Sequence, residues 1–369
     1  MSAPFRTAPF KTTDGTVARS VDQWFGDELN VREFANLKVG GSGVMGDGTG
    51  NDAPCFQAVF DKALKTGGVW NDFTNRRNNR PIFIPAGNYR LTTTLDLVKI
   101  VGGYIRGAGQ YSTRLSYEGA IAGGATITSL LNINGCADFG IGQMSMECPI
   151  GTASDNSCII NLNWDGDNSG NGCDGLHHVH LRELHIGNFG QFGVIVANAG
   201  NDGRATQFTH VNINGNGNPS TTTVGLDVRG PNSAVHIVGG GGLGCLVWAR
   251  CPAGGGSLSA KSWSTGQDVG LDFQMSSGGV MHIGQGRSES KYLAKLTSGT
   301  LTVHSMTTTG ANPVIEINGG KCIVEGNHFV SGEITGTGGQ LYLAANYFNG
   351  VTTPLSGYSG SVVWNEDGV

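Results

Sequence analysis

The sequence is poor in charged residues and in proline, and it has no long apolar run. Only 14% of its 369 residues are charged, and 11 are proline. Because no stretch of about 18 apolar residues occurs, we expect no membrane insertion. A strict Gly-X-Y period is also absent, which excludes collagen. These absences leave a water-soluble protein whose order comes from something other than long helices.

The eight cysteines contain no Cys-x-x-Cys pair, so a finger-type zinc site is excluded. Cys158 and Cys322 lie in apolar alternation, where a reduced thiol acts as a small core residue. Cys245 and Cys251 flank a short apolar run, and their pairing is left open, although a disulfide would be exceptional in a protein that folds in the cytosol. We expect no metal and no cofactor.

The charge balance gives little support for a nucleic-acid partner. The net charge is −5, from 23 basic and 28 acidic residues that are scattered along the chain, and the one dense basic spot is Arg76, Arg77 and Arg80. The first ten residues lack an apolar stretch of signal-peptide length. We therefore expect synthesis and folding in the cytoplasm.

Glycine is abundant, at 62 residues, which is typical of a chain of short strands and frequent turns. One segment predicts a helix, residues 52–65, where apolar residues recur every three or four positions. Asp52 is placed to cap its N-terminus, Pro54 lies in its first turn, and Gly67-Gly68 ends it. An amphipathic helix of this kind needs an apolar surface to cover.

The second half of the chain repeats weakly at about twenty residues. Gly326-Asn327-His328-Phe329 is followed nineteen residues later by Ala345-Asn346-Tyr347-Phe348, and residues 280–283 and 301–304 lie about one such period apart. Repeats of this size stack into solenoids. We therefore predict an all-β parallel β-helix, with Asn327 and Asn346 forming an amide ladder at a repeated bend. A β-sandwich would also alternate, but the single early helix and the scarcity of Asn-Gly hairpins favour the β-helix.

The N-terminal third resembles the opening of the pectate-lyase-like superfamily over roughly residues 30–117. The matching elements, in order, are Asn30-Val31-Arg32-Glu33-Phe34 as a first strand, the loop from Gly46 to Asp52, the helix, Ile82 to Tyr89, and Ile105 to Gly109. Members of this superfamily are right-handed parallel β-helices. The resemblance implies a single-stranded right-handed parallel β-helix (solenoid) with an N-terminal capping α-helix.

The loop from Gly46 to Asp52 lacks the Lys-Ser/Thr of a phosphate loop and the terminal Glu of a calcium loop. We expect a structural turn in which Asp47 and Asp52 cap exposed amides. The catalytic motifs of polygalacturonases and pectate lyases are absent from the rest of the chain. An inherited pectinase activity is therefore not expected.

Residues 18–30 are similar to the short lead-in of many bacteriophage tailspike and tail-fibre proteins. This resemblance implies an N-terminal arm at 1–30 that attaches to a phage tail or baseplate, a β-helix at 31–355, and a C-terminal tail at 356–369. It also implies a homotrimer. Because no trimerisation domain is recognised, the contacts would come from the β-helix sides or from the arm.

The densest acidic cluster lies in the Gly- and Asn-rich segment after residue 163. Asp165 and Asp167 would face the same side of an extended strand, Asp174 follows, and Trp164 is suited to stack on a sugar ring. Paired carboxylates are the groups that glycoside hydrolysis requires. The alternative is that these Asp residues only form turns.

A second group of candidates follows along the chain. Alternation places His178 and His180 on one strand face, and Glu183 and His185 on one face in the same sense. Asp202 is a further candidate acid and Arg204 a candidate substrate ligand, unless the two only pair across a turn. The histidines are either substrate ligands or a solvated stack, although three within four positions could bind a metal.

We expect a phage tailspike or tail-fibre-type protein of the virion that binds a bacterial surface polysaccharide, with or without depolymerising it. Two alternatives are open: a monomeric bacterial polysaccharide lyase or glycoside hydrolase, and a structural virion component without glycan activity. Whether the protein is an enzyme, and whether it would act by hydrolysis or elimination, is not decided by the sequence.

Overall fold

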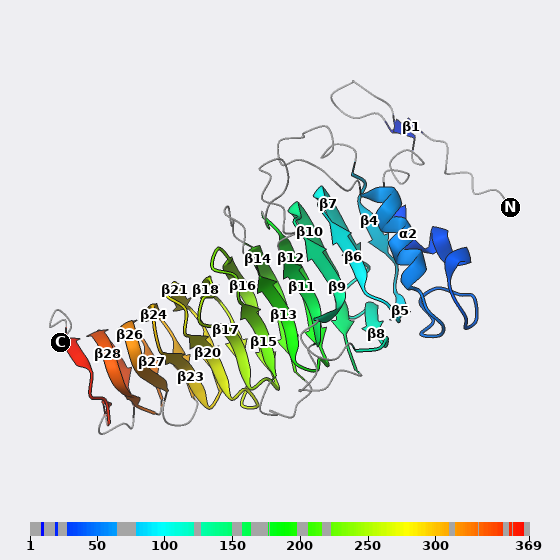
Figure 1. Cartoon of the computed structure of the whole chain (residues 1–369). Helices are drawn as coiled ribbons and strands as arrows, with labels where there is room; N and C mark the ends of the chain where they lie inside the picture. Colours follow the sequence, from blue (N-terminus) through cyan, green and yellow to red (C-terminus); the bar gives the residue numbers. More distant parts are fainter. Residues whose placement is uncertain are drawn as a thin grey trace.

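The computed structural model describes residues 9–10, 19–20, 28–64, 79–121, 127–149, 157–163, 176, 178–197, 206–215, 223–309, 314–330, 332–349, 354–355 and 357–364. From residue 29 onward its strands coil into one solenoid, which begins beside the helix and ends at β30 (Figure 1). Every pair in this stack is parallel. The predicted all-β parallel β-helix is confirmed.

Three sheets run along the solenoid, and we call them A, B and C in chain order. Sheet A contains β3 (Leu29–Asn30), β4 (Ile82–Ile84), β7 (Val101–Gly107), the first halves of β10 (Ala137–Glu147), β12 (His180–Gly187), β14 (Thr206–Asn214) and β16 (Ala234–Leu243), then β18 (Ser257–Lys261), β21 (Val280–Gly284), β24 (Thr300–His304), the second halves of β26 (Ile315–Glu325) and β28 (Ile334–Ala344), and β30 (Ser361–Trp364).

The other two sheets complete each coil. Sheet B contains β5 (Gly87–Leu91), β8 (Thr113–Tyr117), the second halves of β10, β12, β14 and β16, then β19 (Ser264–Thr265), β22 (Arg287–Ser288), β25 (Thr307–Thr308), β27 (His328–Phe329) and β29 (Tyr347–Phe348). Sheet C contains β6 (Leu95–Val98), β9 (Thr128–Asn134), β11 (Ser157–Asn163), β13 (Phe192–Ala197), β15 (Val224–Val228), β17 (Val247–Cys251), β20 (Leu271–Met275), β23 (Tyr292–Leu296) and the first halves of β26 and β28.

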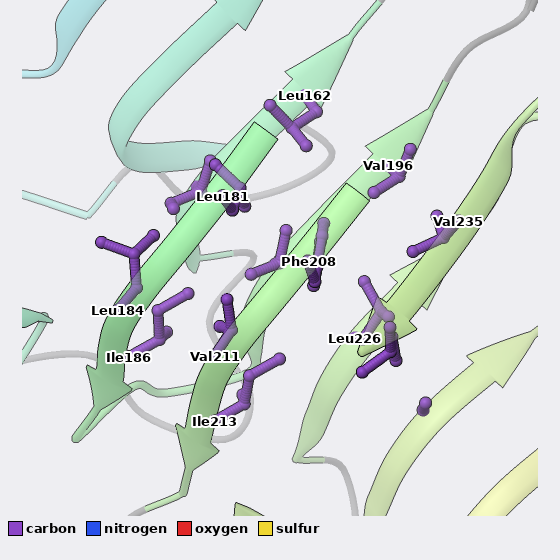
Figure 2. Close-up of a cluster of buried hydrophobic side chains, with 14 of the residues drawn as sticks. Leu162, Leu181, Leu184, Ile186, Val196, Phe208, Val211, Ile213, Leu226 and Val235 are labelled. Atoms are coloured by element: carbon purple, nitrogen blue, oxygen red, sulfur yellow. The ribbon is translucent and has the colours of Figure 1, made fainter. Parts of the chain in front are cut away.

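The core is a set of apolar columns inside the solenoid. Leu181, Phe208 and Ile237 stack in register on sheet A and are buried, and Ile186 stacks on Ile213 on sheet B. Figure 2 shows Leu181 and Phe208, and likewise Ile186 and Ile213, on neighbouring strands of this cluster. Because alternate residues of a strand point to opposite sides, each coil supplies its inward residues to the same columns.

The N-terminal end of the solenoid is covered by α2 (Ala53–Ala63), whose Phe56 packs edge-on against Tyr89, with ring centroids 5.3 Å apart. The predicted helix at 52–65 is confirmed, with Pro54 in its first turn. The cap is a correction, because the Asp52 side chain makes no cap hydrogen bond. It accepts from the Arg90 amide at 3.2 Å instead, and Asn51 Oδ1 accepts from the Ala53 amide at 3.1 Å.

Both ends of the chain differ from the expected boundaries. The first strand, predicted over residues 30–34, is only β3, and a 3-10 helix, η1 (Val31–Leu37), follows it because Asn30 Oδ1 accepts from the Arg32 amide. At the other end, residues 361–364 of the predicted tail form β30, which pairs with β28. In the predicted arm, β1 (Pro9–Phe10) and β2 (Arg19–Ser20) form an antiparallel pair.

The passage from sheet A to sheet B is a tight bend built on one left-handed residue per coil. This residue has φ between 49° and 75° in nine successive coils, at Gln143, Glu183, His210, Gly239, Ser262, Gln285, Ser305, Gly326 and Ala345. The next position in two of these coils is Asn327 and Asn346. Asn327 Nδ2 donates to Asn346 Oδ1 at 2.9 Å, so the predicted amide ladder is confirmed.

The seven described cysteines are buried and none forms a disulfide. Cys322 lies in the inner core and Cys158 on the outside of sheet C. Burial raises the pKa of Cys245 and of Cys251 to about 12, so both thiols are protonated at neutral pH. In the part of the chain that the structure describes, no helix has the length and apolar character needed to cross a membrane.

Candidate functional site

Sheet C is the one face of the solenoid that long connections border on both edges. Sheet A runs into sheet B without interruption in β10, β12, β14 and β16. Between sheets B and C, however, the chain inserts residues 148–156 and 215–223, and between sheets C and A it inserts 164–179 and 198–205. Functional residues of solenoids and barrels gather where loops border a rigid sheet. The outer surface of sheet C is therefore the candidate site.

One column of outward side chains runs the length of this surface. Its members pair in register from strand to strand, and they are Asp96, Asn132, Asn161, Ile195, Asp227, Arg250, Gln274, Lys295, Glu316 and Thr335. All but Ile195 are polar. We call this set the sheet C column.

The N-terminal part of the column forms an amide ladder inside a polar hollow of about 480 Å³. Asn132 Nδ2 donates to Asp96 Oδ1 at 2.9 Å, and Asn161 Nδ2 donates to Asn132 Oδ1 at 3.1 Å. The remaining lining comes from Thr94, Ile127, Ser129, Asn134 and Asn163. Such a surface offers many donors and acceptors to hydroxyl groups and almost no apolar contact.

The middle of the column holds one carboxylate between two arginines. Asp227 is fully buried and accepts from Arg229 Nε at 2.8 Å, from Arg250 Nε at 3.1 Å and from Arg250 Nη2 at 2.9 Å. The arginine side chains remain 31% and 29% exposed. Because two positive charges face one negative charge, the centre of this surface carries a net positive charge that favours an anionic group.

Both guanidinium groups rest on an aromatic ring. The central guanidinium carbons of Arg229 and Arg250 lie 4.4 and 5.7 Å from the centroid of the Phe192 ring. Phe192 belongs to an apolar cluster on the outside of sheet C, with Cys158, Ile195, Val224 and Val247. This outer cluster positions the two guanidinium groups on the outer surface of sheet C.

The C-terminal part of the column borders a second hollow, of about 490 Å³. Tyr292, Leu271 and Leu246 supply its apolar and aromatic lining, and Lys295 and Glu316 stand beside them, with Lys295 Nζ 2.8 Å from Glu316 Oε1. Burial alone would raise the pKa of Glu316, but hydrogen bonds from Lys295 and Asn318 outweigh it and hold that pKa below its ordinary value. An aromatic ring beside charged groups is a common arrangement for a sugar ring.

The structure places three predicted site residues on a different part of the solenoid. His178 has φ 49°, precedes β12, and its Nδ1 lies 3.1 Å from Asp138 Oδ1, while His180 is the exposed first residue of β12. Glu183 is the left-handed residue at the far end of sheet A. It accepts from Gln143 and from Arg182, and these contacts hold its pKa below the ordinary range.

Two predictions about which side chains share a strand face are corrected. His178 lies outside the strand, so the alternation argument that joined it to His180 does not apply. The left-handed Glu183 interrupts the alternation of β12, so that Glu183 lies at the bend whereas His185 lies on sheet B beside Tyr111, with ring centroids 5.6 Å apart. Burial lowers the pKa of His185, which is neutral at neutral pH.

The other predicted residues lie outside the described residues: Trp164, Asp165, Asp167, Asp174, Asp202 and Arg204. In chain order, the first four lie between β11 and β12, and the last two lie between β13 and β14. Both segments therefore belong to connections from sheet C to sheet A.

Sequence analysis missed the residues of the sheet C column, although a signal was present. Asn132-Ile133-Asn134 and Asn161-Leu162-Asn163 repeat the same pattern, and these two triplets pair in register. No repeated sequence pattern indicates the pairing of Asp227 with Arg250, because successive coils in this region differ in length. Among the residues that the structure describes, no three His, Cys, Asp or Glu side chains come together as metal ligands.

The chain matches no protein-family model and no curated protein. Solved structures are similar in fold. The ORF18 protein of Geobacillus virus E2 is 11% identical with a TM-score of 0.57, over 96% of this chain and 66% of that one. The A-module of the mannuronan C-5 epimerase AlgE4 from Azotobacter vinelandii is 15% identical with a TM-score of 0.57, over 91% of this chain and all of that one.

A third similar structure is the endo-xylogalacturonan hydrolase from Aspergillus tubingensis, which is 13% identical with a TM-score of 0.58, over 93% of this chain and 98% of that one. These structures are pectate-lyase-like β-helices. The chain therefore has the fold expected from its first third, a right-handed parallel β-helix with an N-terminal capping helix. At these identities the likeness concerns the fold.

Proposed function

We propose that the protein is a virion component of tailspike or tail-fibre type that binds a bacterial surface polysaccharide along the outer surface of sheet C. The observation that carries this proposal is the sheet C column, which combines an amide ladder, two arginines on an aromatic ring and a tyrosine-lined hollow on one face. Polar ladders satisfy hydroxyl groups and aromatic rings stack on sugar faces, so an extended glycan fits this surface better than a compact ligand.

The phage part of the proposal has two supports. Residues 18–30 resemble the lead-in of tailspike proteins, and a protein of Geobacillus virus E2 shares the fold over 96% of this chain. Under this proposal the protein is a homotrimer, and residues 1–30 attach it to the phage tail or baseplate. A monomeric state in light scattering would contradict this part and favour a free-standing polysaccharide lyase or hydrolase.

Binding is tested by affinity gel electrophoresis against capsular polysaccharide and lipopolysaccharide purified from a panel of bacteria. We expect at least one glycan to retard the protein and Arg250→Gln to weaken this retardation about tenfold, because a charged hydrogen bond contributes roughly 1.5–3 kcal/mol. Arg287→Gln is the matched control, since Arg287 is an exposed arginine paired with Glu289 on sheet B. Retardation by no glycan in the panel would favour a structural virion component.

Cleavage is a separate step, and its acids would have to come from the connections. In the described part of the surface the one central carboxylate, Asp227, is held by two arginines and is not placed to deliver a proton. The predicted acids Asp165, Asp167 and Asp174 belong to the connection between β11 and β12. If the bound glycan is shortened, their replacement by Ala should abolish shortening and preserve retardation, and an unsaturated product that absorbs ultraviolet light would identify elimination.

A further inference from the structure

A second feature of the outer surface lies on sheet A, around Tyr104 of β7. Tyr104 points outward and pairs in register with Gly140 of β10. A Cβ atom on Gly140 would lie 2.5 Å from the ring of Tyr104, and a Cβ atom on Gly142 would lie 2.8 Å from its hydroxyl. The tyrosine ring therefore lies flat across two glycines of the neighbouring strand, and any larger residue there would displace it.

Polar side chains of the next strand border this flat ring. His180 and Arg182 of β12 pair in register with Gly140 and Gly142, so they stand where the glycine surface ends. Arg182 Nε donates to Glu183 Oε1 at 2.9 Å, and the two side chains are 60% and 34% exposed. One edge of the ring thus faces both a hydrogen-bond donor and a hydrogen-bond acceptor that water can reach.

We propose that this surface binds a neutral pyranose unit of a glycan, stacked on Tyr104 and held at its edge by Arg182 and Glu183. A pyranose has one flat face of C–H groups and a rim of hydroxyls that both donate and accept, which matches a flat ring beside a donor and an acceptor. The charges of Arg182 and Glu183 at the rim pair with each other. A neutral sugar is therefore favoured over an acidic one.

This site is independent of the sheet C column, because it lies on another sheet and uses none of the same residues. It includes His180 and Glu183, which the sequence analysis predicted as site residues and which do not belong to the sheet C column. Glu183 is ionised at neutral pH through its contacts with Gln143 and Arg182, so it is ready to accept hydrogen bonds from two hydroxyls.

The test is saturation-transfer nuclear magnetic resonance with the methyl glycosides of glucose, galactose, mannose and rhamnose. We expect a signal from at least one of them, with a dissociation constant on the order of 1 mM, as befits a single sugar ring. Tyr104→Ala should weaken binding about tenfold. Tyr104→Leu keeps an apolar side chain over the glycines and should weaken binding similarly. This variant shows that the loss of binding does not come from a folding defect.

Tyr342 provides the matched control. It points outward from the same sheet, but Lys321 Nζ lies 4.6 Å from its ring centroid, and its register partners are Ile323 and Val363, so no glycine surface lies next to it. Tyr342→Ala should leave the signal unchanged. A signal from none of the four glycosides, or an equal loss in Tyr342→Ala, would overturn the proposal, whereas binding lost only in Arg250→Gln would place the sugar on sheet C alone.

Discussion

The two halves of the solenoid are built on the same interior but on coils of very different length. Gly140 pairs with His180, forty positions along the chain, whereas Lys321 pairs with Gln340, only nineteen positions along. The inward columns nevertheless continue through both halves as one core. The comparison teaches that the inward residues determine the stacking, while the connections at the corners are free to lengthen.

This difference also divides the outer surface of sheet C. Its N-terminal half, from β6 to β17, contains the strands that the long connections join, and it holds the amide ladder and the two arginines. Its C-terminal half is bordered by short turns and holds the open hollow beside Tyr292. We therefore expect the N-terminal half to determine which glycan is bound, and the C-terminal half to add contact area and stability.

The largest expected effect concerns Asp272, the one buried carboxylic acid among the described residues of the C-terminal half. Asp272 is fully buried, and neither carboxylate oxygen has a partner within hydrogen-bond geometry among the described residues. Burial raises its pKa to about 7, against the opposite effect of nearby Ser and Thr hydroxyls. Below about pH 7 the carboxyl group is thus protonated in the folded protein, whereas the unfolded chain releases this proton above a pKa of 3.8.

The contribution of Asp272 to stability should therefore be greatest below about pH 4, should fall as the pH rises toward 7, and should then level off. The shift of about 3 pKa units corresponds to a loss of about 4 kcal/mol in the free energy of unfolding. Asp272→Asn should remove this fall and be more stable than the wild type at pH 8, as measured by urea unfolding between pH 4 and 8. Asp268→Asn, on the exposed turn before β20, is the control and should leave the pH profile unchanged.

The second prediction concerns the amide ladder at the bend between sheets A and B. Asn327 is buried, its Oδ1 accepts from the Met306 amide at 2.9 Å, and its Nδ2 donates to Val303 O at 3.0 Å. Asn327→Ala should cost about 3 kcal/mol of unfolding free energy, because it leaves these buried backbone groups without partners. Asn349→Ala, at an exposed position after β29, should cost less than about 0.5 kcal/mol in the same urea titration.

A third prediction compares the outer apolar cluster with the inner core. Phe192→Ala should cost about 2 kcal/mol of stability, and Phe208→Ala inside the solenoid should cost about 4 kcal/mol, because the inner cavity has no side open to solvent through which it could relax. The effects of the two substitutions on glycan binding should have the reverse order. Phe192→Ala removes the ring below Arg229 and Arg250 and should weaken glycan retardation in the gel, whereas Phe208→Ala at a temperature where it remains folded should not.

The fold was predictable because its main determinants are local and repeated. Inward apolar residues alternate within each short strand, the helix carries its own apolar stripe, and Asn327 and Asn346 mark the same bend nineteen residues apart. The repeat was visible only where coils are short and even. In the N-terminal half, connections of unequal length shift every column, so the same stacking leaves no fixed period in the sequence.

The candidate site was much less predictable, for two physical reasons. The sheet C column joins residues of successive coils, and a pair such as Asp227 and Arg250 is recognised only once the register between coils is known. The second reason is the bend. Glu183 adopts a left-handed conformation that its residue type does not favour. The alternation used to orient Glu183 and His185 therefore ends at Glu183, and no glycine marks this position in the sequence.

The smallest expected effect tests the backbone of that bend in the even half. Gly326 has φ 62°, and a Cβ atom there would meet no atom within 4 Å, so any cost of substitution comes from the left-handed backbone alone. Gly326→Val should cost about 1–2 kcal/mol and Gly326→Asn less than about 0.5 kcal/mol, since Asn tolerates this conformation. Ala345→Gly, at φ 49° in the next coil, should stabilise the protein by less than about 1 kcal/mol. Equal urea midpoints for Gly326→Val and the wild type would mean that the side-chain ladder, and not the backbone geometry, keeps the C-terminal coils even.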